Sequence, residues 1–114
     1  MNLVVVGISH KKAPLELRER FVLNDRNIQE ALRRLQTEAE IEEAVIISTC
    51  NRVEFVLVAF EKQDAMAGFR RFAESFYGIR FDEFADCFYV HHRDEAIRHL
   101  FRCQRLPRRL RSSR

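Results

Sequence analysis

Hydrophobic residues gather in four short runs, and two of the stretches between those runs carry apolar residues at helical spacing. The four runs cover residues 3–9, 44–47, 53–60 and 87–91. Short apolar runs bounded by polar residues are typical of strands that are buried in a sheet. The pattern therefore predicts four strands.

Capping residues and periodicity predict the helices between these strands. Pro14 suits the start of a short helix over residues 15–20. A longer helix begins after Asn24 or Asp25, either of which can cap it. Its predicted apolar face consists of Ile28, Ala31, Leu32, Leu35 and Ala39.

Two more helices follow in the second half of the chain. One is capped by Asp64 and ended by Gly78, and the other is capped by Asp94. The first is expected to turn Met66, Phe69, Phe72, Ala73 and Phe76 inward. The second is expected to be buried through Ala96, Ile97, Leu100 and Phe101.

The order of these elements indicates the fold class. Strand, helix, strand, strand, helix, strand is typical of a ferredoxin-like α/β sandwich of the α+β class. Helices would cover one face of an antiparallel sheet, with an extra C-terminal helix added. A chain of 114 residues with 46% apolar content is enough for one domain with a modest core.

A lone thiol lies at the junction of the two central strands. Cys50 is flanked by Thr49, Asn51 and Arg52, at a strand end or in a tight reversal. A cation beside a thiol favours the nucleophilic thiolate, and a guanidinium also binds carboxylates through paired hydrogen bonds. The same pattern fits a buried cysteine that only fills the core.

Three segments together resemble the N-terminal catalytic domain of glutamyl-tRNA reductases. They are residues 7–20 (GISHKKAPLELRER), 48–52 (STCNR) and 95–102 (EAIRHLFR). The Thr-Cys-Asn-Arg core is the specific part, and the resemblance runs from about residue 3 to residue 102. It implies a catalytic domain over residues 1–102 and a basic tail outside the family pattern over residues 103–114.

The resemblance also implies a reaction. Members of this family attack glutamyl-tRNA with a cysteine, release the tRNA, and reduce the resulting thioester with NADPH to glutamate 1-semialdehyde for tetrapyrrole synthesis. By position, Cys50 would be the nucleophile, and Thr49, Asn51 and Arg52 would contact the substrate. His99 would either polarise the ester or assist proton transfer. The full-length enzyme is expected to be a homodimer.

The chain departs from the family in two respects. It has three glycines and no Gly-x-Gly-x-x-Gly segment, so we expect no NADPH bound to this chain and no completed reduction. After Arg102 the family continues with a Ser-Gly-Leu-Asp helix, whereas this chain reads CQRLP before an arginine-rich end. Pro107 would break a helix there. A frameshift or an added tail would produce such an end.

Charge and cysteine content narrow the kinds of partner and the cellular compartment that we expect for this protein. Five of the 20 basic residues lie in the last ten positions. The rest of the chain contains the other 15 basic residues and all 17 acidic residues, so the net charge of +3 comes from the tail. The basic tail therefore does not indicate an RNA surface. The number of cysteines is odd and no Cys-x-x-Cys pair occurs, which favours a cytoplasmic protein. The apolar start of the chain is too short for a membrane helix, so we expect no membrane partner.

The sequence gives only weak indications of a metal site or of a function other than the reductase. Cys87, His91 and His92 match a zinc site only loosely, because adjacent residues on a strand point to opposite faces, and no metal is expected. Two alternatives to the reductase remain open. One is a redox thiol domain that pairs Cys50 with Cys87 or Cys103. The other is an RNA-binding module with aromatic residues on its sheet.

Overall fold

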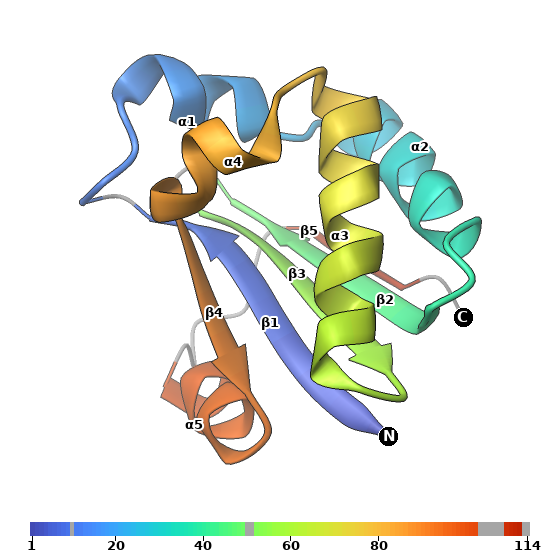
Figure 1. The fold of residues 1–114 in the computed structure, drawn as a ribbon. Coiled ribbons are helices and arrows are strands. Elements are labelled where there is room, and N and C mark those ends of the chain that lie inside the picture. The colour runs from blue at the N-terminus through green and yellow to red at the C-terminus, as the bar shows by residue number, and fades with distance from the viewer. Residues whose placement is uncertain (10, 50–51, 103–108, 113–114) are drawn as a thin grey trace.

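A five-stranded antiparallel sheet forms the centre of the molecule (Figure 1). The computed structural model describes residues 1–9, 11–49, 52–102 and 109–112. The strands are β1 (Asn2–Ile8), β2 (Ile41–Ser48), β3 (Val53–Ala59), β4 (Phe88–His92) and β5 (Arg109–Ser112). Their order across the sheet is β4-β1-β3-β2-β5. Every neighbouring pair is antiparallel.

The first four strands confirm the predicted α+β fold class. Helices α1 (Leu15–Phe21) and α2 (Asp25–Gln36) connect β1 to β2, and α3 (Lys62–Tyr77) leads from β3 towards β4. This is the order of a ferredoxin-like sandwich. Two short elements that the pattern did not predict, α4 (Phe81–Phe84) and the 3-10 helix η1 (Ala85–Cys87), precede β4. The fourth strand therefore begins one residue later than expected.

One face of the sheet holds the main core. Helices α1, α2 and α3 cover this face, and Phe55, Phe69 and Phe72 pack there with ring centroids 5.1 to 5.9 Å apart. Alternate residues of β1 and β3 point into it, as the period of a strand requires. The inward face predicted for α3 is confirmed, with Phe69, Phe72 and Ala73 fully buried and Met66 and Phe76 packed against the core.

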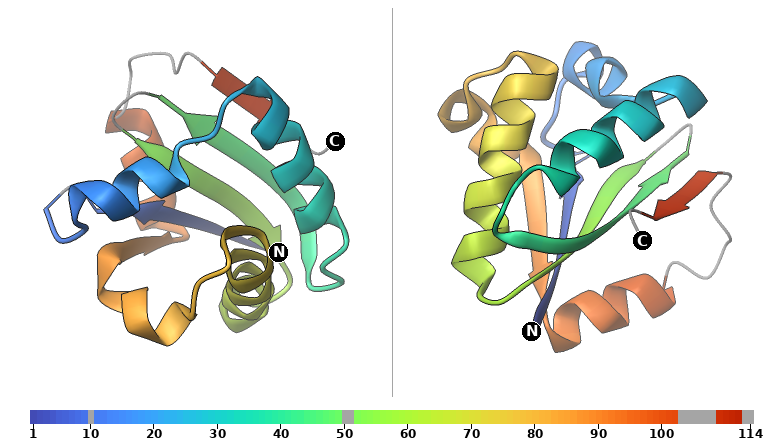
Figure 2. Two further views of the ribbon diagram at one scale, coloured as in Figure 1. Left: turned by 90° about the horizontal axis from the view of Figure 1, so that it is seen from above. Right: turned by 90° about the vertical axis from the view of Figure 1, so that its right-hand side faces the viewer.

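The last helix packs against the opposite face of the sheet. Helix α5 (Asp94–Arg102) places Ala96 against Val5 and Val56, on the side away from α3 (Figure 2). The prediction that Ile97 and Phe101 are buried is wrong, because they are 44% and 72% exposed. A helix lying on a sheet buries only the side that faces it, and Ile97 and Phe101 lie outside that side.

The structure confirms two of the predicted helix caps, at Asn24 and Gly78, and contradicts two others. Asn24 caps α2 by accepting a hydrogen bond from the Asn27 N–H at 2.9 Å, and Gly78 ends α3 in the left-handed conformation, with φ of 66°. Asp64 and Asp94 are not caps but lie in the first turns of α3 and α5. An acidic side chain there still interacts favourably with the helix dipole.

Two further details of the chain differ from the prediction. Ala39 is exposed, because α2 ends at Gln36 and the chain turns towards β2. Strand β5 was not predicted in the basic tail. It pairs with β2, whose outer edge would otherwise present unpaired backbone groups. Pro107, predicted to break a helix, lies outside the described residues.

Candidate functional site

Strands β2 and β3 are joined beside the predicted nucleophile. The Thr49 N–H donates to the Arg52 carbonyl at 2.7 Å, and the Arg52 N–H donates to the Thr49 carbonyl at 3.4 Å. The preceding Ser48 is buried and its hydroxyl donates to the Leu23 carbonyl at 3.2 Å, which fixes this end of β2 to the chain before α2. Cys50 and Asn51, which connect Thr49 to Arg52, lie outside the described residues.

A buried carboxylate lies two positions after Arg52. Glu54 of β3 has no exposed surface and points to the face on which α5 lies, since its neighbours Val53 and Phe55 point into the main core. Its Oε2 is contacted by the Tyr89 hydroxyl and by His99 Nε2, and its Oε1 lies 3.4 Å from Arg52 Nε. Burial of a charge is costly unless charged or hydrogen-bonding groups compensate it, and these three groups do so.

Tyr89 reaches Glu54 by crossing over a glycine. Gly7 of β1 pairs with Glu54 on one side and with Tyr89 on the other. A Cβ on Gly7 would lie 2.3 Å from Cζ and the hydroxyl oxygen of Tyr89. The absence of a side chain at position 7 therefore lets the tyrosine ring lie flat across β1 and bring its hydroxyl to Glu54.

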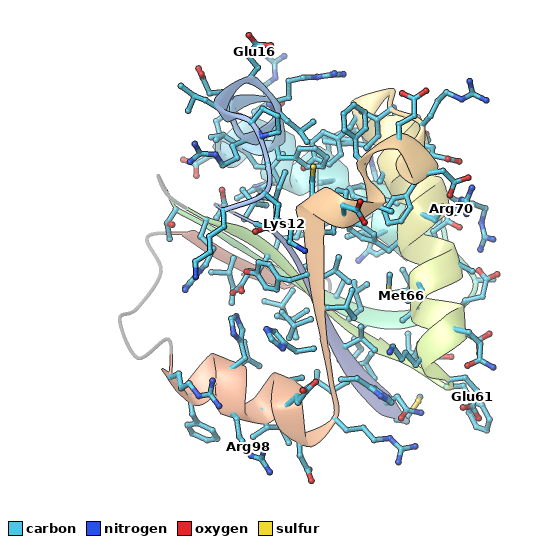
Figure 3. The ribbon with its side chains drawn as sticks, turned by 60° about the vertical axis from the view of Figure 1, so that its left-hand side comes forward. Lys12, Glu16, Glu61, Met66, Arg70 and Arg98 are labelled. Carbon is cyan, nitrogen blue, oxygen red and sulfur yellow. The ribbon has the colours of Figure 1, made fainter. Side chains whose placement is uncertain are left out.

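His99 comes to the same carboxylate from α5. Its side chain is 19% exposed, whereas the preceding Arg98 projects from the helix away from the sheet (Figure 3). The His99 ring stacks on His91 of β4, with centroids 4.3 Å apart and planes at 27°. Burial, and next the charge of His99, lower the pKa of His91 below its ordinary value. Two imidazoles, a phenol and a carboxylate thus share one partly buried cluster.

The structure brings together two of the predicted site residues from distant parts of the chain. Arg52 follows the β2–β3 connection and His99 lies in the last helix, and Glu54 contacts both. Thr49 lies at the other side of the same connection. Sequence reasoning missed Glu54 and Tyr89. A signal for Glu54 was present, because it is the one acidic residue within the otherwise apolar run 53–60.

The histidines and the cysteine of the loosely matched zinc pattern have other contacts. His92 Nε2 lies 3.0 Å from Asn2 Oδ1, His91 stacks on His99, and Cys87 Sγ lies 4.0 Å from the Lys12 carbonyl. Among the described residues, no group of three or more His, Cys, Asp or Glu is placed to hold a metal ion. No helix in the described part of the chain combines the length and the apolar character that a membrane span requires.

Comparison with known proteins identifies the domain that carries this cluster. Residues 6–104 match the family described as the N-terminal domain of glutamyl-tRNA(Glu) reductase. The chain belongs to this family. It is 41% identical over 102 residues to the glutamyl-tRNA reductase of Geobacter metallireducens, 40% to that of Heliobacterium mobile and 35% to that of Prochlorococcus marinus strain MIT 9215.

These relatives are much longer than the chain. Each of the three alignments covers 90% of this chain but only 23% or 24% of the relative. The chain therefore spans about a quarter of the glutamyl-tRNA reductases that it matches. The resemblance seen in residues 7–20, 48–52 and 95–102 is confirmed by a match that includes all three segments.

The glycines of this reductase domain do not form a dinucleotide site. Gly7 lies in β1 beneath Tyr89, Gly68 packs inside α3 against Ile41, and Gly78 ends α3. A Rossmann site needs glycines in the turn between a strand and the following helix, where the backbone approaches the pyrophosphate. All three glycines lie in the described residues and none occupies such a turn, so these residues do not fit NADPH.

Proposed function

We propose that this domain performs the acyl-transfer half of the glutamyl-tRNA reductase reaction. The Cys50 thiolate attacks the ester carbonyl of glutamyl-tRNA, a carbon–sulfur bond forms, and the bond to the ribose oxygen breaks. The proton lost by the thiol ends on the ribose hydroxyl of the released tRNA. The product is a glutamyl thioester on Cys50.

Support for this proposal comes from the way Glu54 joins Arg52 to His99. Arg52 follows Cys50 and Asn51 in the sequence, and Glu54 contacts both Arg52 and His99. We propose that this cation and this imidazole serve a substrate acyl group at the Cys50 thiol. Arg52 is suited to a substrate carboxylate, because its planar guanidinium matches the two oxygens. Thr49 and Asn51 are proposed to complete the contacts with the glutamyl group.

Reduction of the thioester belongs to the whole protein rather than to this domain. The relatives' name implies a reductant, and we propose NADPH in the rest of the full-length enzyme, which then forms glutamate 1-semialdehyde for tetrapyrrole synthesis. We also propose that the full-length enzyme is a cytoplasmic homodimer. Residues 1–102 are proposed to be the catalytic domain, and residues 103–114 a basic tail outside the family pattern, of which residues 109–112 pair with β2.

The competing RNA-binding function has less support. Base stacking on a sheet needs aromatic rings on its open surface. Phe55 is 1% exposed within the main core, and Phe88 packs against the same core. Phe60 is 68% exposed but lies beyond the end of β3. These rings do not form a stacking surface.

Trapping the acyl group tests the proposal. The chain is incubated with tRNA carrying labelled glutamate, quenched in acid and separated from tRNA. We expect protein-bound label in wild type and in Cys87→Ser, which removes a thiol on another element, and no label in Cys50→Ser. Equal labelling of all three proteins would refute the proposed nucleophile. Tight tRNA binding without any labelling would favour the binding module, and a peroxide-induced disulfide of Cys50 would favour the redox domain.

A further inference from the structure

The contact between Glu54 and His99 bears on where the histidine carries its proton. The carboxylate is fully buried, yet Oε1 lies 3.4 Å from the Arg52 guanidinium and Oε2 accepts from the Tyr89 hydroxyl. An ionised carboxylate only accepts hydrogen bonds, so the His99 nitrogen beside it must donate.

The nitrogen that faces Glu54 is Nε2. In a neutral imidazole one ring nitrogen carries the hydrogen and the other carries the lone pair, and the partner of one nitrogen decides the assignment. A hydrogen on Nε2 leaves the lone pair on Nδ1. We propose that Glu54 is a positioning residue that holds His99 as the Nε2–H tautomer, so that Nδ1 exchanges the proton during acyl transfer.

This tautomer selects between the two roles open to His99. A neutral imidazole with its lone pair on Nδ1 accepts a proton there and cannot polarise an ester by donating from that atom. Nδ1 takes the proton of the Cys50 thiol as the carbon–sulfur bond forms. It then gives that proton to the ribose oxygen as the carbon–oxygen bond breaks, which returns His99 to its starting state. This step rests on the proposed function of Cys50.

The surroundings of His99 support positioning by Glu54. Helix α5 is anchored to the sheet mainly by Ala96 and the partly buried Leu100, which leaves little packing to orient a ring. His91 stacks on one face of the His99 imidazole and restricts its tilt. Stacking does not distinguish the two ring nitrogens, whereas the contact with Glu54 does.

The tautomer is measured directly by nitrogen NMR. The whole chain is labelled with ¹⁵N-histidine, and His99 is assigned by comparison with His99→Asn at a pH where the imidazole is neutral. We expect the Nε2–H pattern for His99 in wild type and in Glu43→Gln, which makes the same change at an exposed site on β2. In Glu54→Gln the side-chain amide can donate to Nε2, so the Nδ1–H form should increase.

The rate of acyl transfer is the second readout. Glu54→Gln should lower it by about 100-fold or more, within the range of general acid–base catalysis. The double variant with His99→Asn should be no slower than His99→Asn alone, because both changes remove one function. Should Glu54→Gln fail to fold, Glu54→Asp is the second variant: its carboxylate is one methylene shorter and loses the contact with Nε2, so the Nδ1–H form should increase.

The outcomes separate this inference from the proposed function. An Nδ1–H tautomer in wild type, or an unchanged tautomer and rate in Glu54→Gln, would overturn the positioning role even if Cys50 is labelled. A correct tautomer that Glu54 controls, in a protein that transfers no glutamate to Cys50, would leave the positioning contact intact and refute the proposed reaction.

Discussion

The ring of Tyr89 occupies the space in which a side chain on Gly7 would lie. The two residues pair across β1 and β4, and a Cβ on Gly7 would lie 2.3 Å from the tyrosine hydroxyl oxygen. The glycine thus controls whether the hydroxyl can reach Glu54. One missing side chain on a central strand determines the hydrogen bonding of a carboxylate on the next strand.

Gly7→Ala should therefore damage the site more than the fold. The added methyl displaces the Tyr89 ring, which removes a donor from Glu54, and we expect at least a tenfold loss in the rate of acyl transfer, about 1.4 kcal/mol. Gly78→Ala is the control, since it meets no atom within 4 Å but strains a residue with φ of 66°. It should cost about 1–2 kcal/mol of stability and leave the rate of the folded protein unchanged. Equal rates for both variants would contradict the role of Gly7.

Replacement of Arg52 by lysine should weaken substrate binding although the charge is kept. Lysine lacks the planar pair of donors that matches a carboxylate. We expect a loss of about 10- to 100-fold in acyl-transfer efficiency, the equivalent of a charged hydrogen bond. Arg70→Lys serves as the control, because Arg70 forms an exposed pair with Asp82 at 2.8 Å and points outward from α3 (Figure 3). Similar effects of both changes would refute a specific role for Arg52.

The lowered pKa of His91 predicts a pH dependence of stability. In the unfolded chain His91 gains its proton near pH 6.5, whereas in the folded protein burial and the charge of His99 delay protonation to lower pH. Between the two pKa values the unfolded state holds more protons, so the free energy of unfolding falls as pH falls through this window. Above pH 6.5 this contribution is fully present.

Urea unfolding of wild type and His91→Asn from about pH 7.5 down to about pH 5 measures this effect. The wild type should lose more stability on acidification than the variant, because the variant has no imidazole at position 91. Parallel curves for the two proteins would show that His91 titrates alike in both states.

The aromatic core predicts a large stability effect at Phe69. This side chain is fully buried and its ring lies within 6.2 Å of the rings of Phe55, Phe72, Phe81 and Phe88. Phe69→Ala should lower the free energy of unfolding by about 3–5 kcal/mol through lost burial and a cavity. Phe60→Ala, at a side chain that is 68% exposed, should have much less effect. Urea denaturation of both variants checks the difference.

Local patterns predicted the elements of this fold, and distant contacts defined the site. The periodicity of α3 and the cap at Asn24 depend on neighbours within a few residues, so both were visible in the sequence. Two of the three partners of Glu54, Tyr89 and His99, are 35 and 45 positions away and meet it only through strand register and the placement of α5. The pattern indicated a strand at Glu54 but not what its carboxylate contacts.

The wrong burial predictions in α5 have the same cause, because they too depend on distant contacts. Ile97 and Phe101 continue an apolar spacing that predicts a buried helix, yet among the apolar residues of this helix only Ala96 and Leu100 pack against the sheet. Strand β5 escaped prediction because pairing at a sheet edge depends on backbone groups rather than on an apolar pattern. The fold class could be predicted from the order of the elements. The face of the sheet that the last helix covers could not, because it depends on how the strands and helices assemble.

Mass spectrometry of the intact chain after brief exposure to glutamyl-tRNA tests most directly whether Cys50 accepts the glutamyl group. We expect a mass increase of one glutamyl residue, sensitive to hydroxylamine as a thioester is, located by peptide mapping on Cys50 and absent in Cys50→Ser. A glutamyl adduct located on Cys87 or Cys103, or an adduct that persists in Cys50→Ser, would contradict Cys50 as the nucleophile.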